Sequence, residues 1–102
     1  MSASNYIDLL ADAIRENTPV DLLPDDADDL QQLFRLYALL GLSKGEAVTT
    51  RDVHDAWAIW MLERDEAHES LVPFDQLGPE IQAEDQPFVD AILAALILRR
   101  GS

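Results

Sequence analysis

Apolar residues recur at steps of three and four positions along most of the chain, which is the spacing that one face of an α-helix produces. The clearest example is the run of Leu30, Leu33, Phe34, Tyr37 and Leu40. No segment stands out as the alternation of polar and apolar residues that marks a half-buried strand. The pattern predicts an all-α fold, a compact bundle of four to five helices that forms one domain over residues 1–102.

Capping residues and helix breakers predict where the first two helices begin and end. Ser4 is the expected N-cap of a first helix that ends near Asn17. Three acids spaced four positions apart share a face of this helix that we expect to be solvated, namely Asp8, Asp12 and Glu16. The second helix should begin within residues 25–29, where carboxylates favour the positive end of the helix dipole, and should end at Gly41.

The second half of the chain carries a strong helix start and one conflict. Thr49 is expected to cap the third helix, with Asp52 three residues later as the acidic partner of a capping box. Residues 68–78 contain apolar side chains in an irregular segment, which predicts a loop packed onto the helices. Pro87 would kink a continuous helix, so we expect a short helix, a break and a last helix over about residues 86–100.

The composition is that of a globular protein with a strong acidic excess. The chain has 102 residues, of which 48% are hydrophobic, and its 20 acidic and 7 basic side chains give a formal net charge of −13. Lysine and arginine make the contacts of proteins with nucleic acids and anionic membranes, so this charge argues against direct binding to either. The chain contains no cysteine, which excludes a disulfide scaffold, a thiolate metal site and a cysteine nucleophile.

Neither a membrane span nor a signal sequence is predicted. The longest apolar run, Ala91–Leu98, has eight residues, whereas a spanning helix needs about 20. The beginning of the chain lacks the basic and apolar stretches of a signal peptide. We therefore expect a cytoplasmic protein, located in the host cytoplasm if a phage encodes it.

The sequence offers no pattern for a metal site, a cofactor or catalysis. A calcium loop needs a glycine at its sixth position, and the segment that starts at Asp25 has Leu30 there. Asp65 and His68 have the Glu-x-x-His type of spacing, but a carboxylate-bridged metal pair needs that motif twice. No Ser-His-Asp order, phosphate-binding loop or HExxH motif is present. We therefore expect a protein that is not an enzyme and that binds neither metal nor cofactor.

The predicted third helix carries aromatic residues on one face. His54, Trp57 and Trp60 recur every three residues, so their side chains are neighbours on the helix surface. Aromatic stripes on helices usually pack in a core, and this is the simpler interpretation. In the second interpretation, one indole and the imidazole line a pocket for a planar ligand.

The last predicted helix is apolar over more than half of its circumference. Its apolar residues include Val89, Ile92, Leu93, Leu96 and Ile97. Such a helix is either the central strut of the core or a surface that a second copy of the chain covers. Of these two interpretations we slightly favour the homodimer interface.

Two segments of the chain match the pattern of a known repeat. Val53–Ala58 has the order Val-His-acid-x-Trp, and His68–Leu77 ends in Leu-Val-Pro-Phe followed by Asp-Gln-Leu. Together with the charged stretch Glu80–Asp85, they resemble the ryanodine-receptor repeat over residues 50 to about 93. The sequence differs from that family in having Gln86-Pro87 where basic residues are usual, and it lacks the Gly-Trp that often follows the first helix.

The resemblance implies a helical module that binds a nucleotide-type small ligand. The residues that would serve it are Arg51, His54, Trp57, Trp60, Pro73 and Phe74. Over its whole length the chain is also similar to small acidic proteins of actinobacteria and their phages, in the Phe34–Leu40 stretch and the Val53–Trp60 helix. That group has no established activity, so this similarity indicates an origin and not a mechanism.

The acidic charge favours a non-enzymatic interaction protein of phage type, which binds and modulates a host or viral protein with a basic surface. The densest group of acids is its expected contact surface and consists of Asp21, Asp25, Asp26, Asp28 and Asp29. An interpretation of equal weight is that these acids only cap a helix and keep the protein soluble. The alternative function is the ligand-binding module, and a nucleic-acid mimic, whose carboxylates imitate phosphates, ranks lower.

Overall fold

The described part of the chain is helical. The structure, a computed structural model, describes residues 5–23 and 27–101, and the side chains of residues 5–23 and 30–98. The α-helices in these ranges are α1 (Tyr6–Glu16), α2 (Ala27–Lys44), α3 (Thr50–Leu62), α4 (Pro79–Ala83) and α5 (Gln86–Gly101). Short 3-10 helices lie between them, namely η1 (Val20–Leu22), η2 (Gly45–Ala47) and η3 (Phe74–Gln76). These ranges contain no strand, so the prediction of an all-α bundle is confirmed.

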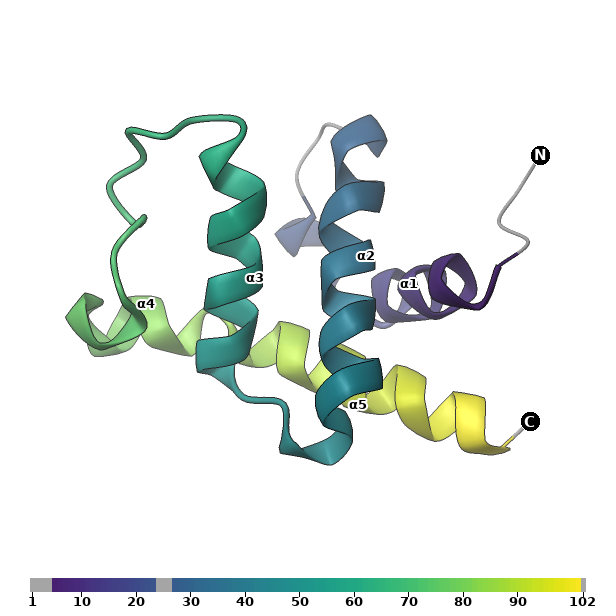
Figure 1. Cartoon of the computed structure of the whole chain (residues 1–102). Helices are drawn as coiled ribbons and strands as arrows, with labels where there is room; N and C mark the ends of the chain where they lie inside the picture. Colours follow the sequence, from purple (N-terminus) through teal and green to yellow (C-terminus); the bar gives the residue numbers. More distant parts are fainter. Residues whose placement is uncertain (1–4, 24–26, 102) are drawn as a thin grey trace.

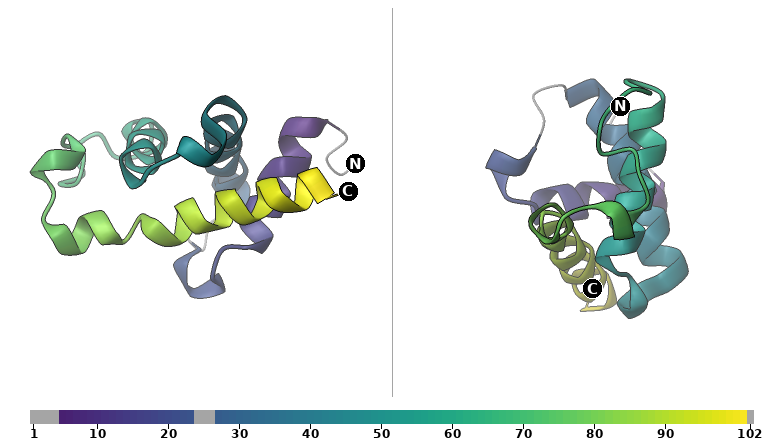
Figure 2. Two further views of the ribbon diagram at one scale, coloured as in Figure 1. Left: turned by 90° about the horizontal axis from the view of Figure 1, so that it is seen from below. Right: turned by 90° about the vertical axis from the view of Figure 1, so that its left-hand side faces the viewer.

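The helices form two layers. Helices α2 and α3 lie side by side, and α5 crosses both of them on one side (Figures 1 and 2). Helix α1 packs against α2 and α5, and the short α4 contacts α3. The beginning of α5 and the end of α4 therefore lie near α3, although the intervening sequence is long.

The core lies between these two layers. Its largest fully buried side chains are Tyr37, Phe34, Ile14, Leu30, Ile92 and Val53. Three of them belong to the apolar run that predicted α2, which makes α2 the central helix. Burial of each large apolar side chain contributes roughly 1.5–3 kcal/mol, so this shared core is what holds the two layers together.

Side-chain caps start two of the helices. The Thr49 side chain accepts a hydrogen bond from the backbone N–H of Asp52, whose own carboxylate accepts one from the Thr49 N–H, so the predicted capping box is confirmed. At α1 the cap is Asn5, whose Oδ1 accepts from the N–H of Asp8 at 2.7 Å. The predicted cap, Ser4, lies outside the described residues.

Gly41 does not end α2, so that prediction is wrong. The helix continues to Lys44, and the residue after it, Gly45, has the positive φ of 56° that stops a helix. Gly41 instead lies where α2 packs closely against α5. A Cβ added to it would lie 3.2 Å from Cγ2 of Ile92 and 3.5 Å from Cδ2 of Leu96 on α5.

Asp8 is buried, contrary to the expected solvated face of α1. Its residue is only 4% exposed, whereas Asp12 and Glu16 on the same face are exposed as expected. The reason is Arg35 on α2, which forms an ion pair with the Asp8 carboxylate. A charge can be buried when it is paired and hydrogen-bonded in this way.

The helical structure is interrupted before Pro87, as predicted. Helix α4 ends at Ala83 and α5 begins at Gln86, which places Pro87 in the first turn, where a missing N–H costs little. The backbone carbonyl of Asp85 accepts from the N–H groups of Phe88 and Val89 at 3.1 and 3.2 Å. The break thus sets Asp85 at the entrance of α5.

The segment between α3 and α4 is the irregular packed loop that the sequence predicts. His54 on α3 donates from Nε2 to the carbonyl oxygen of Val72 at 2.7 Å. Gln82 on α4 donates to the carbonyl oxygens of Phe74 and Leu77, both at 3.0 Å. These bonds from two helices fix the loop against the bundle.

Candidate functional site

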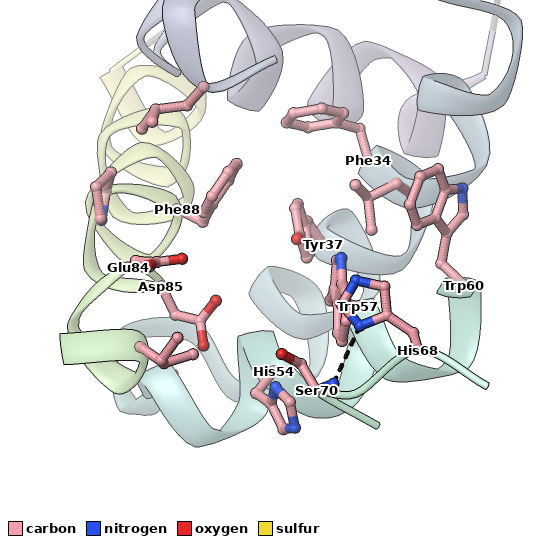
Figure 3. A pocket seen from close by; sticks show the side chains of 14 residues that line it. Phe34, Tyr37, His54, Trp57, Trp60, His68, Ser70, Glu84, Asp85 and Phe88 are labelled. Atoms are coloured by element: carbon pink, nitrogen blue, oxygen red, sulfur yellow. Dashed lines mark hydrogen bonds between the residues drawn. The ribbon is translucent and has the colours of Figure 1, made fainter. Parts of the chain in front are cut away.

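A pocket of about 450 Å³ lies between α2, α3 and the junction of α4 with α5 (Figure 3). Its aromatic and imidazole lining consists of Phe34, Tyr37, His54, Trp57, Trp60, His68 and Phe88. Ligand pockets in proteins usually have about 300–1,000 Å³ and a mainly apolar lining with a few polar groups. The pocket thus has the size and character of a small-molecule site.

Helix α3 supplies one wall of the pocket. His54 is 4% exposed, and its ring stacks on Trp57 with 5.7 Å between centroids and 26° between planes. Its Nε2 bonds to the Val72 carbonyl, which can only accept, so Nε2 carries a proton. The bond to Val72 fixes the orientation of the imidazole and, through it, the position of the stacked indole.

The loop after α3 supplies His68 and Ser70. The N–H of Ser70 donates to Nδ1 of His68 at 3.0 Å (Figure 3). Since Nδ1 accepts, the neutral ring carries its proton on Nε2. The imidazole meets Trp57 in an edge-on arrangement with 5.1 Å between centroids and 81° between planes. Trp57 is therefore held between two histidines, one from its own helix and one from the loop.

The α4–α5 junction supplies two carboxyl groups, from Glu84 and Asp85. In Figure 3 the Asp85 carboxyl extends into the space that separates this junction from α3. Burial raises the pKa of Asp85 to about 6, with the neighbouring charge of His54 lowering it and that of Glu84 raising it. Near neutral pH this carboxyl can therefore change between a proton donor and an ionised acceptor.

The floor of the pocket is part of the hydrophobic core. Phe34 and Tyr37 meet edge to face with 5.4 Å between centroids, and Tyr37 packs on Phe88 at 5.5 Å. Burial raises the pKa of the Tyr37 phenol well above its usual value, so the hydroxyl stays protonated at any physiological pH. The floor is therefore aromatic and uncharged.

The six ligand-binding residues implied by the repeat resemblance divide into two groups. His54, Trp57 and Trp60 line the pocket. Trp60 is only 7% exposed and also belongs to the core, whereas Trp57 is half-buried, so the core and pocket interpretations of the aromatic stripe each hold in part.

The other three residues lie outside the pocket lining. Arg51 is paired with Asp75 and lies over the ring of Phe74, with 5.3 Å from its Cζ to the ring centroid. Phe74 packs beside His54 with 6.1 Å between centroids, and Pro73 is exposed. Arg51 is therefore directed to the loop and not to a ligand in the pocket.

The structure describes only part of the predicted acidic contact surface. Asp21 lies in η1 and is exposed. Asp25 and Asp26 lie outside the described residues, and Asp28 and Asp29 belong to the first turn of α2 with side chains outside the described part. A contiguous acidic surface thus stays a prediction.

The predicted dimer surface on α5 needs a correction. Val89, Ile92 and Leu96 are 5%, 0% and 7% exposed because they pack in the core of the single chain. Leu93 is partly buried, and Ile97 is exposed at 66%. Most of this apolar face is therefore the central strut of the core, which was the other interpretation of the same pattern.

Sequence reasoning missed the acidic wall and His68 as pocket residues. Glu84 and Asp85 appear in the sequence as two more acids in an acidic chain, and only the break before Pro87 brings them toward α3. That break was itself predictable, and it was the available signal. Among the described residues, no group of three or more acidic, histidine or cysteine side chains is arranged to hold a metal ion.

Comparison with known proteins gives a family but no activity. No curated protein and no solved structure shows significant similarity to the chain. Among the described helices, none has the length and apolar character needed to cross a membrane. A family model described as a domain of unknown function, DUF7701, matches residues 5–97, so the chain belongs to that family.

Proposed function

We propose that this protein is a non-enzymatic binding module whose pocket takes a small planar ligand. The observation that carries the proposal is the convergence of His54 and Trp57 from α3 with Asp85 from the α4–α5 junction on one pocket of about 450 Å³. The flat faces of the aromatic walls favour a planar ring, because stacked or edge-on aromatic contacts add about 0.5–1.5 kcal/mol each beyond the burial of area.

The hydrogen bonds of the polar groups in the pocket favour a role in orienting a ligand. One ring nitrogen of each histidine is hydrogen-bonded to the backbone. Nε2 of His54 donates to the carbonyl oxygen of Val72, and Nδ1 of His68 accepts from the N–H of Ser70. The hydroxyl of Ser70 lines the pocket but forms no hydrogen bond to His54 or His68, so it lacks the neighbouring base that would activate it for covalent catalysis. These facts support binding over catalysis.

The resemblance to the ryanodine-receptor repeat supports the same class of ligand in a narrower form. A nucleotide-type ligand presents a planar base that suits the aromatic walls. Its phosphates would be repelled by the carboxylates of Glu84 and Asp85, and no lysine or arginine of the described residues lines the pocket. A base or nucleoside therefore fits better than a phosphorylated nucleotide.

Tryptophan fluorescence tests the proposal directly, because both tryptophans line the pocket. Titration with nucleobases, nucleosides, adenine nucleotides and cyclic dinucleotides should shift or quench the emission for at least one planar compound. Trp57→Ala should abolish that binding, as followed by amide NMR shifts. The matched control Leu62→Ala alters an exposed side chain of the same helix outside the pocket and should leave binding unchanged. A flat response in fluorescence and NMR across the panel refutes the proposal.

The net charge of −13 supports a second candidate, an acidic interaction protein of phage type that binds a host or viral protein with a basic surface. Asp21, which is exposed on η1, begins the segment that would make the contact, and Asp25, Asp26, Asp28 and Asp29 continue it. Neutralising the last four together should remove partners from an affinity capture in host lysate, and an unchanged partner set would contradict this role. Nucleic-acid mimicry, tested by competition with duplex DNA, is the weaker form of it.

A homodimer remains part of this proposal only through the exposed end of α5. Ile97 and Leu98 are 66% and 60% exposed, unlike the apolar residues before them. Light scattering should give twice the monomer mass if these residues cover a second copy. A monomer mass for the native chain would exclude the dimer while leaving the pocket unaffected.

A further inference from the structure

The pocket combines aromatic walls and two histidines with carboxyl groups. Glu84 and Asp85 lie on one side, and the rings of Trp57, Trp60 and Phe88 form much of the rest. No arginine or lysine with a described side chain lines it. The two carboxyl groups therefore meet the aromatic faces with no ammonium or guanidinium group of the described side chains in the lining.

The basic side chains described around this region have other contacts. Arg35 pairs with Asp8, Lys44 with Asp52 and Arg51 with Asp75. The guanidinium of Arg64 lies over the ring of Trp60, with 4.2 Å from its Cζ to the centroid. None of these pairs includes Glu84 or Asp85. The described lysine and arginine side chains thus form no ion pair with Glu84 or Asp85, and the neighbouring charge that lowers the pKa of Asp85 is that of His54.

We infer that the ligand of this pocket is a planar organic cation, whose charged N–H groups bind the carboxyl group of Asp85 while its ring lies among the aromatic walls. The inference rests on the proposed function and names the chemical class of the ligand. Two N–H donors of an amidinium or guanidinium group match the two oxygens of a carboxylate. The negative faces of aromatic rings attract the same cation.

The environment of Asp85 supports this choice. Burial raises the pKa of Asp85 to about 6 because desolvation outweighs the opposing effect of His54, and a bound cation would stabilise the desolvated carboxylate. The titratable groups that line the pocket around it are His54 on α3, His68 in the loop, Glu84 beside it and Tyr37 on α2. Binding of the cation should strengthen as the pH rises through about 6, because Asp85 ionises over that range.

Three compounds of nearly the same shape separate charge from shape. Benzamidine is a planar cation that stays protonated throughout the useful pH range, benzamide is its neutral counterpart, and benzoate is its anionic counterpart. We expect NMR and fluorescence titrations of the intact protein at pH 7 to give binding of benzamidine about tenfold or more tighter than benzamide, with benzoate weakest. Equal binding of benzamide and benzamidine would overturn the inference and leave the proposed planar-ligand function standing, whereas binding of none, together with a flat nucleoside panel, would overturn both.

A pair of variants tests the residue assignment. Asp85→Asn keeps the shape and the helix-capping ability of the side chain and should weaken benzamidine about tenfold, and so remove its preference over benzamide. Asp90→Asn removes the same charge from an exposed position of α5 outside the pocket, so it should change neither affinity. The preference of the native protein for benzamidine over benzamide stands as a test even if Asp85→Asn does not fold. Unchanged benzamidine binding by folded Asp85→Asn would overturn the assignment.

Discussion

Arg35 on α2 holds Asp8 on α1 through two hydrogen bonds, with 2.6 Å from Nε to Oδ1 and 2.9 Å from Nη2 to Oδ2. Asn5, the cap of α1, donates to the same carboxylate at 2.8 Å. The bonds from Arg35 and Asn5 lower the pKa of Asp8 well below its usual value, since they stabilise the ionised form more than burial opposes it. One buried carboxylate therefore joins the start of α1 to the middle of α2.

Replacing Asp8 with asparagine should destabilise the protein and lower its thermal midpoint by several degrees. The amide cannot neutralise Arg35, and the loss falls on a contact between two helices and not on a surface pair. Thermal unfolding followed by circular dichroism at pH 7 measures the effect. Asp12→Asn, one turn further along α1 and exposed, is the control and should shift the midpoint little. Equal midpoints for the two variants would show that the ion pair contributes nothing.

The Asp8 pair also shows where sequence reasoning fails. The spacing of Asp8, Asp12 and Glu16 correctly puts them on one helical face, but spacing does not say how a second helix lies against that face. Arg35 is 27 positions away, and only the packing of α2 on α1 brings it to Asp8. Periodicity predicted the helices and much of the core because both depend on local order, whereas a long-range ion pair depends on the angle between elements.

Alanine at Gly41 should destabilise the protein by about 1 kcal/mol, although alanine is the better helix former. The added methyl group would lie 3.2 Å from Cγ2 of Ile92, a fully buried side chain with little room to move. Overpacking of this kind costs about 1–3 kcal/mol, which outweighs the roughly 1 kcal/mol gained from helix propensity. Urea unfolding gives the difference in free energy.

The crowding at Gly41 can be checked by a double-mutant cycle. In an Ile92→Ala background the Cγ2 atom is gone, so Gly41→Ala should become neutral or stabilising. Additive effects would mean that the two residues do not press on each other. Coupling between the two residues would identify Gly41 as a glycine that admits a neighbouring helix, which in one sequence looks the same as a glycine that ends a helix.

Alanine at His54 should loosen the loop over the pocket and cost about 2 kcal/mol of stability. The change leaves the Val72 carbonyl without its donor and removes the ring that stacks on Trp57. Limited proteolysis should cut within residues 63–78 faster than in the native protein, and urea unfolding should give the loss of stability.

Asp55→Ala is the matched control for His54. Asp55 is the next residue of α3 and is exposed, so its loss should change neither the cleavage rate nor the stability by much. If His54→Ala were cleaved at the native rate, the loop would be held by other contacts. The bonds from Gln82 to Phe74 and Leu77 would then be the next candidates.

The sequence predicted half of the candidate site. His54, Trp57 and Trp60 could be found because helical spacing alone puts them on one face, and the motif that resembles the repeat draws attention to them. The acids opposite them could not be chosen from 20 similar residues by composition or spacing. Their position depends on the turn between α4 and α5, which the sequence indicates at Pro87 but does not orient in space.

Asp85→Asn should change how the stability of the protein depends on pH. The folded-state pKa of Asp85, about 6, lies above its usual value of 3.8, so the folded protein holds this proton more tightly than the unfolded chain. The stabilisation is complete below the unfolded pKa and is lost as the pH rises through about 6. The asparagine variant lacks this loss, so its stability relative to the native protein should rise between about pH 4 and pH 7.

Urea unfolding over that range measures the difference, and Asp90→Asn should give a curve nearly parallel to the native one. A parallel curve for Asp85→Asn as well would mean that Asp85 keeps an ordinary pKa in the fold. The Asp8 ion pair does not obscure the result. Because the pKa of Asp8 is lowered in the folded protein, its contribution to stability is lost only as the pH falls below about 4.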